Sequence, residues 1–212
     1  EGTMHPTPKD VGWIEVVVGS MFSGKTEELI RRCRLAQIAK REVLVFKPAM
    51  DKRFAEKEIV SRADVRLPCR AVSTAQEIRS AAGEATVVGV DEAQFFDEDL
   101  VAVCEELANS GKRVIVAGLD QDFRGEPFKV VAHLMSVAEY VKKVLAICVV
   151  CGNPANRSQS IVASTSRIVV GDTDVYEARC RKCFVPDTPG PHQEDLPLKK
   201  DGAPQPRPEP AP

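Results

Sequence analysis

Residues 19–26 read Gly-Ser-Met-Phe-Ser-Gly-Lys-Thr and match the pattern G-x-x-x-x-G-K-[ST] of a phosphate-binding loop. A β-branched run at residues 13–18 precedes the loop, and apolar residues recur at helical spacing among the charges of residues 25–39 after it. Glycines allow a backbone to wrap around an anion, and the amides at the start of a helix donate hydrogen bonds to it. This strand–loop–helix order predicts an α/β fold around a phosphate site; the alternative interpretation is an ordinary strand-to-helix turn.

The loop residues are the first candidates for nucleotide binding. Lys25 is expected to neutralise the β- and γ-phosphates, and Thr26 is expected to offer its hydroxyl to Mg²⁺. The expected ligands are therefore ATP and Mg²⁺. The candidate nucleotide-binding residues of the loop are Gly19, Ser20, Met21, Phe22, Ser23, Gly24, Lys25 and Thr26.

Two adjacent carboxylates end the apolar strand expected at residues 86–91. Asp91 is the expected acidic partner of the cation and is also counted among the candidate cofactor-binding residues. The predicted magnesium ligands are Thr26 and Asp91. Glu92 follows directly, and at the carboxyl end of a strand both side chains can border the cleft. One carboxylate could then serve the metal and the other the nucleophile, whereas the alternative is two solvated residues at a strand end.

Strands and helices alternate along the chain up to residue 147, which predicts a mainly parallel sheet. Residues 49–64 are charged and weakly periodic, so a mobile loop is expected there. Further strands are expected at residues 42–46, 67–72, 113–117 and 142–147. Further helices are expected at residues 74–82, 97–109 and 130–140, the first of them with a capping box.

Four of the seven cysteines form two C-x-x-C pairs, which is a strong signal for zinc. Four thiolates complete a tetrahedral shell and leave no open position, so the predicted role of the metal is structural. Disulfides would instead suit a secreted protein, but no signal peptide is expected here, and a redox site would need only one pair. The predicted zinc ligands are Cys148, Cys151, Cys180 and Cys183, whereas Cys33, Cys69 and Cys104 are expected in the core.

The 28 residues between the two pairs contain two runs of strand character, at residues 160–170 and 175–180, around a turn sequence. A β-rich loop clamped by the metal at its base is expected. After it, residues 186–212 hold nine of the 15 prolines and few large apolar side chains. This tail is expected to be disordered, with a proline-rich partner motif as the alternative. The predicted units are therefore residues 11–147, 148–185 and 186–212.

The charge balance excludes some partners. The chain carries 29 Lys and Arg against 31 Asp and Glu, a formal net charge of −2. No basic excess attracts a phosphate backbone, so no nucleic-acid partner is expected. No apolar stretch approaches the roughly 20 residues that a membrane-spanning helix needs, so no membrane partner is expected either.

Further motifs follow the phosphate loop in a fixed order. They are residues 47–53 (Lys-Pro-Ala-Met-Asp-Lys-Arg), 91–96 (Asp-Glu-Ala-Gln-Phe-Phe), 119–128 (Leu-Asp-Gln-Asp-Phe-Arg-Gly-Glu-Pro-Phe) and the two C-x-x-C pairs. Over residues 11–183, this series closely resembles the type II thymidine kinases found in human cytosol and many bacteria. The resemblance implies a RecA-like domain and a small zinc domain carrying a lasso loop. It also implies transfer of the ATP γ-phosphate to the 5′-hydroxyl of thymidine or deoxyuridine, in nucleotide salvage for DNA synthesis.

The resemblance also implies roles for individual residues. Glu92 would be the general base at the 5′-hydroxyl, and Lys25, Thr26 and Arg53 would serve the phosphates and Mg²⁺. A cytoplasmic homotetramer that is inhibited by dTTP is implied as well. The residues implied to bind the nucleoside are Met21, Phe95, Leu119, Phe123, Tyr176 and Ser158 through side chains, and Val169, Val170 and Gly171 through the backbone. Phe96 and Phe128 are equally well read as core residues.

Two positions depart from the family pattern. Ser160 stands where many members carry Arg, and Phe54 follows Arg53 where Tyr is common. Arg157 is a candidate substitute for the missing cation.

Two other classes of protein also combine a phosphate loop with four cysteines. An adenylate-kinase-like enzyme would need several Arg residues for a charged acceptor and a lid inserted in mid-chain, whereas here the cysteine unit comes last. A zinc-ribbon ATPase that remodels nucleic acid would need a basic face, which the near-neutral composition disfavours.

Overall fold

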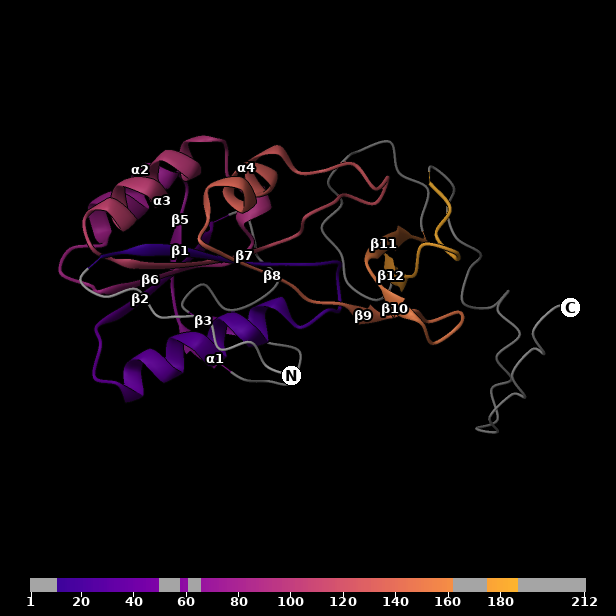
Figure 1. The fold of residues 1–212 in the computed structure, drawn as a ribbon, viewed down its shortest axis with the longest axis horizontal. Helices are drawn as coiled ribbons and strands as arrows, with labels where there is room; N and C mark the ends of the chain where they lie inside the picture. Colours follow the sequence, from indigo (N-terminus) through magenta and orange to yellow (C-terminus); the bar gives the residue numbers. More distant parts are fainter. Residues whose placement is uncertain (1–10, 50–57, 61–65, 162–174, 187–212) are drawn as a thin grey trace, which may run out of the picture.

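The computed structural model describes residues 11–49, 58–60, 66–161 and 175–186. Its centre is a six-stranded sheet in which every neighbouring pair of strands is parallel, as the sequence predicted (Figure 1). In spatial order the strands are β5 (Arg70–Val72), β2 (Val43–Pro48), β6 (Val87–Val90), β7 (Arg113–Gly118), β1 (Trp13–Val18) and β8 (Tyr140–Lys143).

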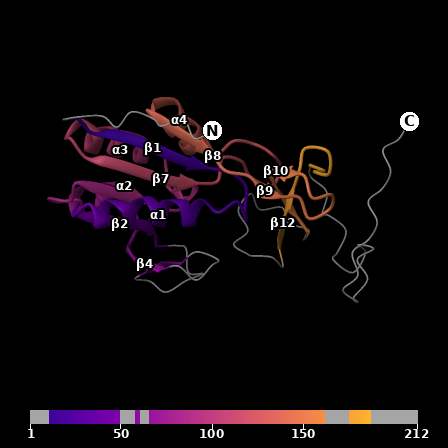
Figure 2. The ribbon, with the colours of Figure 1, turned by 60° about the horizontal axis from the view of Figure 1, so that its bottom comes forward.

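Helices cover both faces of this sheet, which explains the apolar strands: side chains on alternate positions meet helices on opposite sides. Val17 of β1 faces α1 (Lys25–Ile38), whereas Val16 and Val18 belong to the core cluster on the other face. That other face carries α2 (Ala75–Ala81), α3 (Asp99–Asn109) and α4 (Lys129–Val137), as Figures 1 and 2 show. Cys33 and Cys104 are fully buried and Cys69 is 9% exposed, so all three lie in the core as expected. None of the helices in the described part of the chain is long and apolar enough to span a membrane.

Several expected boundaries were wrong. Within the stretch expected to be a loop, β3 (Glu58–Val60) pairs with β4 (Arg66–Pro68), and Ile59 and Leu67 pack on the α1 side of the sheet (Figure 2). The strand expected at residues 67–72 is therefore two strands, β4 and β5, which belong to different sheets.

The other two differences adjoin β8. The helix expected to reach Tyr140 ends at Val137, because Tyr140 pairs with Glu15 of β1 and so continues the sheet. The strand expected at residues 142–147 also divides, since β8 ends at Lys143 and the chain then leaves the sheet.

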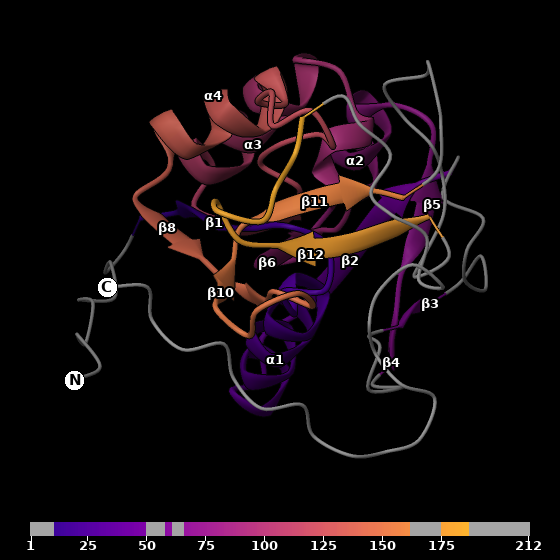
Figure 3. The ribbon, with the colours of Figure 1, turned by 90° about the vertical axis from the view of Figure 1, so that its right-hand side faces the viewer.

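A second, smaller unit lies beyond the carboxyl ends of the parallel strands. It contains the antiparallel pairs β9 (Ala146–Ile147) with β10 (Pro154–Ala155), and β11 (Arg157–Ser160) with β12 (Tyr176–Arg179). Seen from that end, β11 and β12 lie in front of the main sheet (Figure 3). The strand character expected from residue 160 thus begins earlier, at Arg157. The tail expected to be disordered, apart from Pro186, lies outside the described residues.

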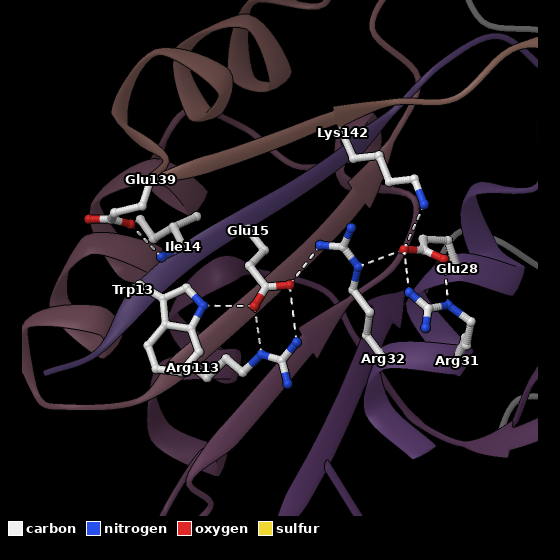
Figure 4. A network of polar contacts seen from close by, with 9 residues as sticks. All are labelled: Trp13, Ile14, Glu15, Glu28, Arg31, Arg32, Arg113, Glu139 and Lys142. Atoms are coloured by element: carbon white, nitrogen blue, oxygen red, sulfur yellow. Dashed lines mark hydrogen bonds and ion pairs between the residues drawn. The ribbon is translucent and has the colours of Figure 1, made fainter. Parts of the chain in front are cut away.

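A network of ion pairs fixes α1 against the sheet (Figure 4). The carboxylate of Glu15 accepts hydrogen bonds from Arg113 of β7 at 2.7 Å and from Arg32 of α1 at 2.6 Å. Arg32 also donates to Glu28, which Lys142 of β8 reaches at 3.0 Å. Because both carboxylates are mostly buried, these bonds hold the helix that begins directly after the phosphate loop.

We expect Glu28→Gln to destabilise the fold in a pH-dependent way. Burial alone would raise the pKa of Glu28, but hydrogen bonds from Arg31, Arg32 and Lys142 lower it to about 2. A lowered pKa stabilises the fold above the unfolded-state value, and this contribution is lost as the pH falls toward the folded-state value. The free energy of unfolding should therefore fall by about 2 kcal/mol at pH 7, allowing for solvent screening, with the difference vanishing between about pH 4.5 and 2.

Urea titrations of both proteins from pH 7 down to pH 2.5 would check this. Glu27→Gln is the matched control, because Glu27 is exposed in the same helical turn. A Glu28→Gln deficit that stays constant across the pH range would contradict the electrostatic explanation.

Candidate functional site

The phosphate loop begins and ends at positions that favour glycine. A Cβ atom at Gly19 would lie 2.2 Å from the carbonyl oxygen of Val144, so no larger residue fits there. Gly24 caps α1 in the left-handed conformation (φ 82°), and as a glycine it offers no side chain to the amides of the first turn. Phe22 also has a positive φ of 66°, which is uncommon for a residue with a side chain. The result is an uncapped helix start beneath a tight loop, which is the arrangement that binds anions.

Three of the four side chains predicted to serve phosphate and cation meet at this loop. Lys25 folds over it, and its Nζ donates to the carbonyl of Ser20 at 2.8 Å. The hydroxyl of Thr26 donates to Asp91 at 3.1 Å, although the two residues are 65 positions apart in sequence. Asp91 follows β6, so the parallel sheet brings its carboxylate to the start of α1, where Thr26 lies.

Glu92 lies at the same edge in a strained backbone conformation. Its φ of 52° and ψ of 45° are left-handed, and they turn the chain from β6 into the short 3₁₀ helix η1 (Ala93–Phe95). Strain of this kind persists only where the surroundings enforce it, and it is common at functional sites. Burial and the neighbouring charge of Glu92 raise the pKa of Asp91 to about 7, and a cation beside Asp91 would favour its charged form.

A small apolar cluster lies next to the loop and unites residues that the sequence scatters. Met21, Phe123 and Tyr176 are each at least nine-tenths buried within it, and Leu119 packs against them. Phe22 and Val175 are further partly buried members. Four of the residues predicted to line the nucleoside pocket are therefore neighbours.

The remaining phenylalanines divide between this edge and the core. Phe95 is partly exposed at the end of η1. Phe96 and Phe128 are buried in the large cluster that the sheet shares with α2, α3 and α4, so these two are core residues.

The smaller unit is bonded directly to the phosphate loop. The Ser158 hydroxyl of β11 accepts a hydrogen bond from the backbone amide of Met21 at 3.0 Å, and both residues are buried. The hydroxyl of Ser20 reaches the carbonyl of Ala155 at 3.4 Å. Ser158, which was predicted to bind the nucleoside, is bonded to the phosphate loop in the structure.

We expect Ser158→Ala to lower the free energy of unfolding by about 1–3 kcal/mol, because it leaves the buried amide of Met21 without its acceptor. Equilibrium denaturation measures this effect. Ser80→Ala, on the exposed side of α2, is the matched control and should change the same quantity by less than about 0.5 kcal/mol. Equal effects of the two substitutions would show that the bond to Met21 contributes nothing.

The four cysteines of the C-x-x-C pairs converge in the smaller unit. Their sulfur atoms all lie within 4.8 Å of one another, and Cys151 is 3.6 Å from both Cys180 and Cys183. With Zn–S bonds of about 2.3 Å, sulfurs on a tetrahedron lie about 3.8 Å apart. The backbone amides of Cys183 and Phe184 both donate to the carbonyl of Cys180. These bonds fix the turn that carries the second C-x-x-C pair. The cluster is thus compatible with structural zinc.

The remaining positions named from the sequence either make other contacts in the structure or fall outside the described residues. Arg157, the candidate substitute cation, donates to the side-chain oxygen of Gln121 and lies 5.6 Å from the centre of the Phe184 ring. It therefore joins the loop after β7 to the smaller unit. Ser160 is buried in β11. The positions outside the described residues are Arg53, Phe54, Val169, Val170 and Gly171.

One buried polar residue at this edge was not anticipated from the sequence. Gln94 is 5% exposed in η1, and its side chain bonds both to Glu92 and to the backbone of Leu119. Its signal was an amide within the otherwise apolar run of residues 93–96.

Comparison with known proteins agrees with this arrangement. The sequence profile of the family described as thymidine kinase matches residues 12–184. A curated relative named thymidine kinase, from Rhodothermus sp. (strain ITI 518), is 58% identical over 179 residues, which cover 84% of each chain. A match over most of the length, together with the phosphate loop and the cysteine cluster, leads to one conclusion: the chain belongs to the thymidine kinase family.

Proposed function

We propose that this enzyme transfers the γ-phosphate of ATP to the 5′-hydroxyl of thymidine, and also of deoxyuridine, giving the 5′-monophosphate and ADP. The observation that carries the proposal is the placement of the phosphate loop, the Asp91–Glu92 pair and the apolar cluster at one edge of the sheet. The family membership supports the same reaction. In the cell, such a reaction belongs to nucleotide salvage for DNA synthesis.

The phosphate loop binds and orients the triphosphate in this proposal. The loop amides and the ammonium of Lys25 face the phosphates, and Arg53 adds a further positive charge. Thr26 and Asp91 would hold Mg²⁺, since their oxygens lie together, 3.1 Å apart. A cation held there would offset charge on the phosphate oxygens.

Glu92 acts on the acceptor. Its carboxylate orients the 5′-hydroxyl toward the γ-phosphorus and takes the proton as the new O–P bond forms and the bond to ADP breaks. A carboxylate is a weak base for an alcohol, but phosphoryl transfer depends chiefly on positioning and on charge stabilisation. The left-handed backbone at Glu92 supports a role that needs a fixed carboxylate.

The apolar cluster provides the slot for the thymine ring. Met21, Leu119, Phe123 and Tyr176 offer the flat apolar contacts that a base needs, and Phe95 adds a ring at the end of η1. Ser158 contributes its hydroxyl near Met21. The backbone of Val169, Val170 and Gly171 binds the polar edge of the base, as the family resemblance implies.

The chain is divided into a nucleotide-binding domain (residues 11–147), a zinc-binding lasso domain (148–185) and a tail (186–212) in this account. Separate apolar clusters support a division near the first boundary, since Cys148 and Cys180 pack with Ala146, Ala155 and Ala178 rather than with the large core. Zinc held by the four cysteines fixes the lasso domain. We further propose a cytoplasmic homotetramer, inhibited by dTTP, that binds neither nucleic acid nor membrane.

A nucleoside panel tests the substrate. With Mg·ATP present, ADP release should depend on thymidine, proceed with deoxyuridine, and fall to background with purine nucleosides. Added dTTP should suppress the thymidine-dependent rate. ADP release that ignores the nucleoside, or that responds to single-stranded DNA instead, would favour an ATPase and overturn the proposal.

A further inference from the structure

The side chain of Gln94 bridges Glu92 to the next strand of the sheet. Its amide nitrogen donates to the carboxylate of Glu92, and its amide oxygen accepts from the backbone N–H of Leu119 at 2.9 Å. The partners fix this orientation, because a flipped amide would place two donors together at Leu119 and two acceptors together at Glu92. Both halves of one buried amide are thus satisfied.

The backbone around Gln94 depends on the turn at Glu92. The left-handed conformation at Glu92 starts η1, in which the amide of Phe95 donates to the carbonyl of Glu92 at 3.1 Å. This turn brings Gln94 back toward the carboxylate that precedes it by two residues. The direction of the Glu92 side chain is therefore set by the turn together with the bond from Gln94.

The sheet leaves room for this amide at one position. A Cβ atom at Gly118 would lie 3.1 Å from the side-chain oxygen of Gln94 and 3.2 Å from the Cβ of Ala93. Gly118 is an ordinary residue of β7 and has no left-handed backbone. Glycine at position 118 therefore provides space rather than a special conformation, because an added Cβ atom would crowd Gln94, Ala93 and Val131.

Leu119, which donates to Gln94, also belongs to the wall of the apolar cluster. This residue packs against the cluster of Met21, Phe123 and Tyr176, and it begins the loop that carries Phe123. A single amide thus ties the carboxylate that faces the acceptor hydroxyl to the wall of the pocket that would hold the acceptor base.

We infer that Gln94 is a positioning residue for phosphoryl transfer, which holds the Glu92 carboxylate in line with the acceptor hydroxyl and in register with Leu119. The inference rests on the proposed function, because Gln94 acts only through Glu92. On this inference Gln94 acts in catalysis, and it is not a buried polar residue that serves folding alone.

Gln94→Met tests this, since methionine has a similar length but forms neither bond. We expect kcat to fall about 10- to 100-fold, with the thymidine KM and the Kd of Mg·ATP each within about threefold of wild type. In a Glu92→Gln background the same substitution should change kcat less than about threefold, because the group that it positions is already gone. Gln76→Met, on the exposed face of α2, is the matched control and should leave kcat unchanged.

Gly118→Ala is the second variant, in case Gln94→Met does not fold. Its methyl group displaces the amide of Gln94, so we expect kcat to fall about three- to tenfold in wild type and to stay unchanged in the Glu92→Gln background. A wild-type kcat in either variant, or an equal loss in both backgrounds, would overturn the positioning role while thymidine phosphorylation itself stands. Failure of the proposed base role of Glu92 has a different signature, namely full activity of Glu92→Gln alone, whereas failure of the proposed function would show as ADP release that does not depend on thymidine.

Discussion

Glu92→Gln is expected to lower kcat for thymidine about 10³-fold, within the range typical for loss of a general base. Glutamine keeps the shape of the side chain and can still accept a hydrogen bond from Gln94, but it cannot take a proton from the acceptor hydroxyl. The phosphate loop is untouched by this change, so the Kd of Mg·ATP should stay within about threefold of wild type. Steady-state kinetics and a direct ATP titration measure the two quantities.

The control for this experiment is Glu98→Gln, because Glu98 is exposed at the start of α3, a few residues further along the chain. It should have wild-type kcat. If Glu92→Gln loses ATP affinity in proportion to kcat, then Glu92 serves nucleotide binding. If its kcat stays within threefold of wild type, Glu92 is not the base.

Cys151→Ser is expected to abolish the proposed zinc binding and, with it, thymidine phosphorylation. Structural zinc binds to zinc-finger peptides with about 10–16 kcal/mol, and the apolar cluster of the smaller unit is small in the part of the chain that the structure describes. Without the metal, β11 and β12 should no longer hold Ser158 and Tyr176 against the phosphate loop. We therefore expect kcat/KM for thymidine to fall more than about 100-fold.

Metal analysis and kinetics of the purified variant check this expectation. Wild type should carry about one zinc per chain, and Cys151→Ser well below that. Arg181→Ala is the matched control, because Arg181 lies exposed between the second pair of cysteines and offers no thiolate. A metal-free Cys151→Ser protein with full activity would refute the structural role of zinc.

Local patterns with a strong physical signal were enough to predict most of the fold. The phosphate loop, the strands that flank it and the helix after it match the expected positions because glycine spacing and β-branched runs leave few alternatives. The capping box at the start of α2 is also confirmed, since the Thr74 hydroxyl accepts from the amide of Glu77 at 3.3 Å. Short strands such as β3 escaped prediction because three residues are too few to establish a period.

The contacts of the site were less predictable, since they join distant segments. The bond between Ser158 and Met21 crosses 137 positions, and no local pattern encodes it. The left-handed backbone at Glu92 is equally hidden, because the usual signal for that conformation is glycine. Gln94 could have been noticed as a lone amide among apolar neighbours, but its two partners depend on the parallel order of β6 and β7.

The central claim is that the γ-phosphate moves from ATP to the 5′-oxygen of thymidine. A single-turnover reaction with excess enzyme, γ-labelled Mg·ATP and thymidine tests it directly, with the labelled product identified by mass spectrometry and ³¹P NMR. We expect the label to appear in thymidine 5′-monophosphate in step with ADP, and we expect Glu92→Gln to slow this transfer with ATP still bound. Label that appears in inorganic phosphate at the same rate with and without thymidine would contradict it.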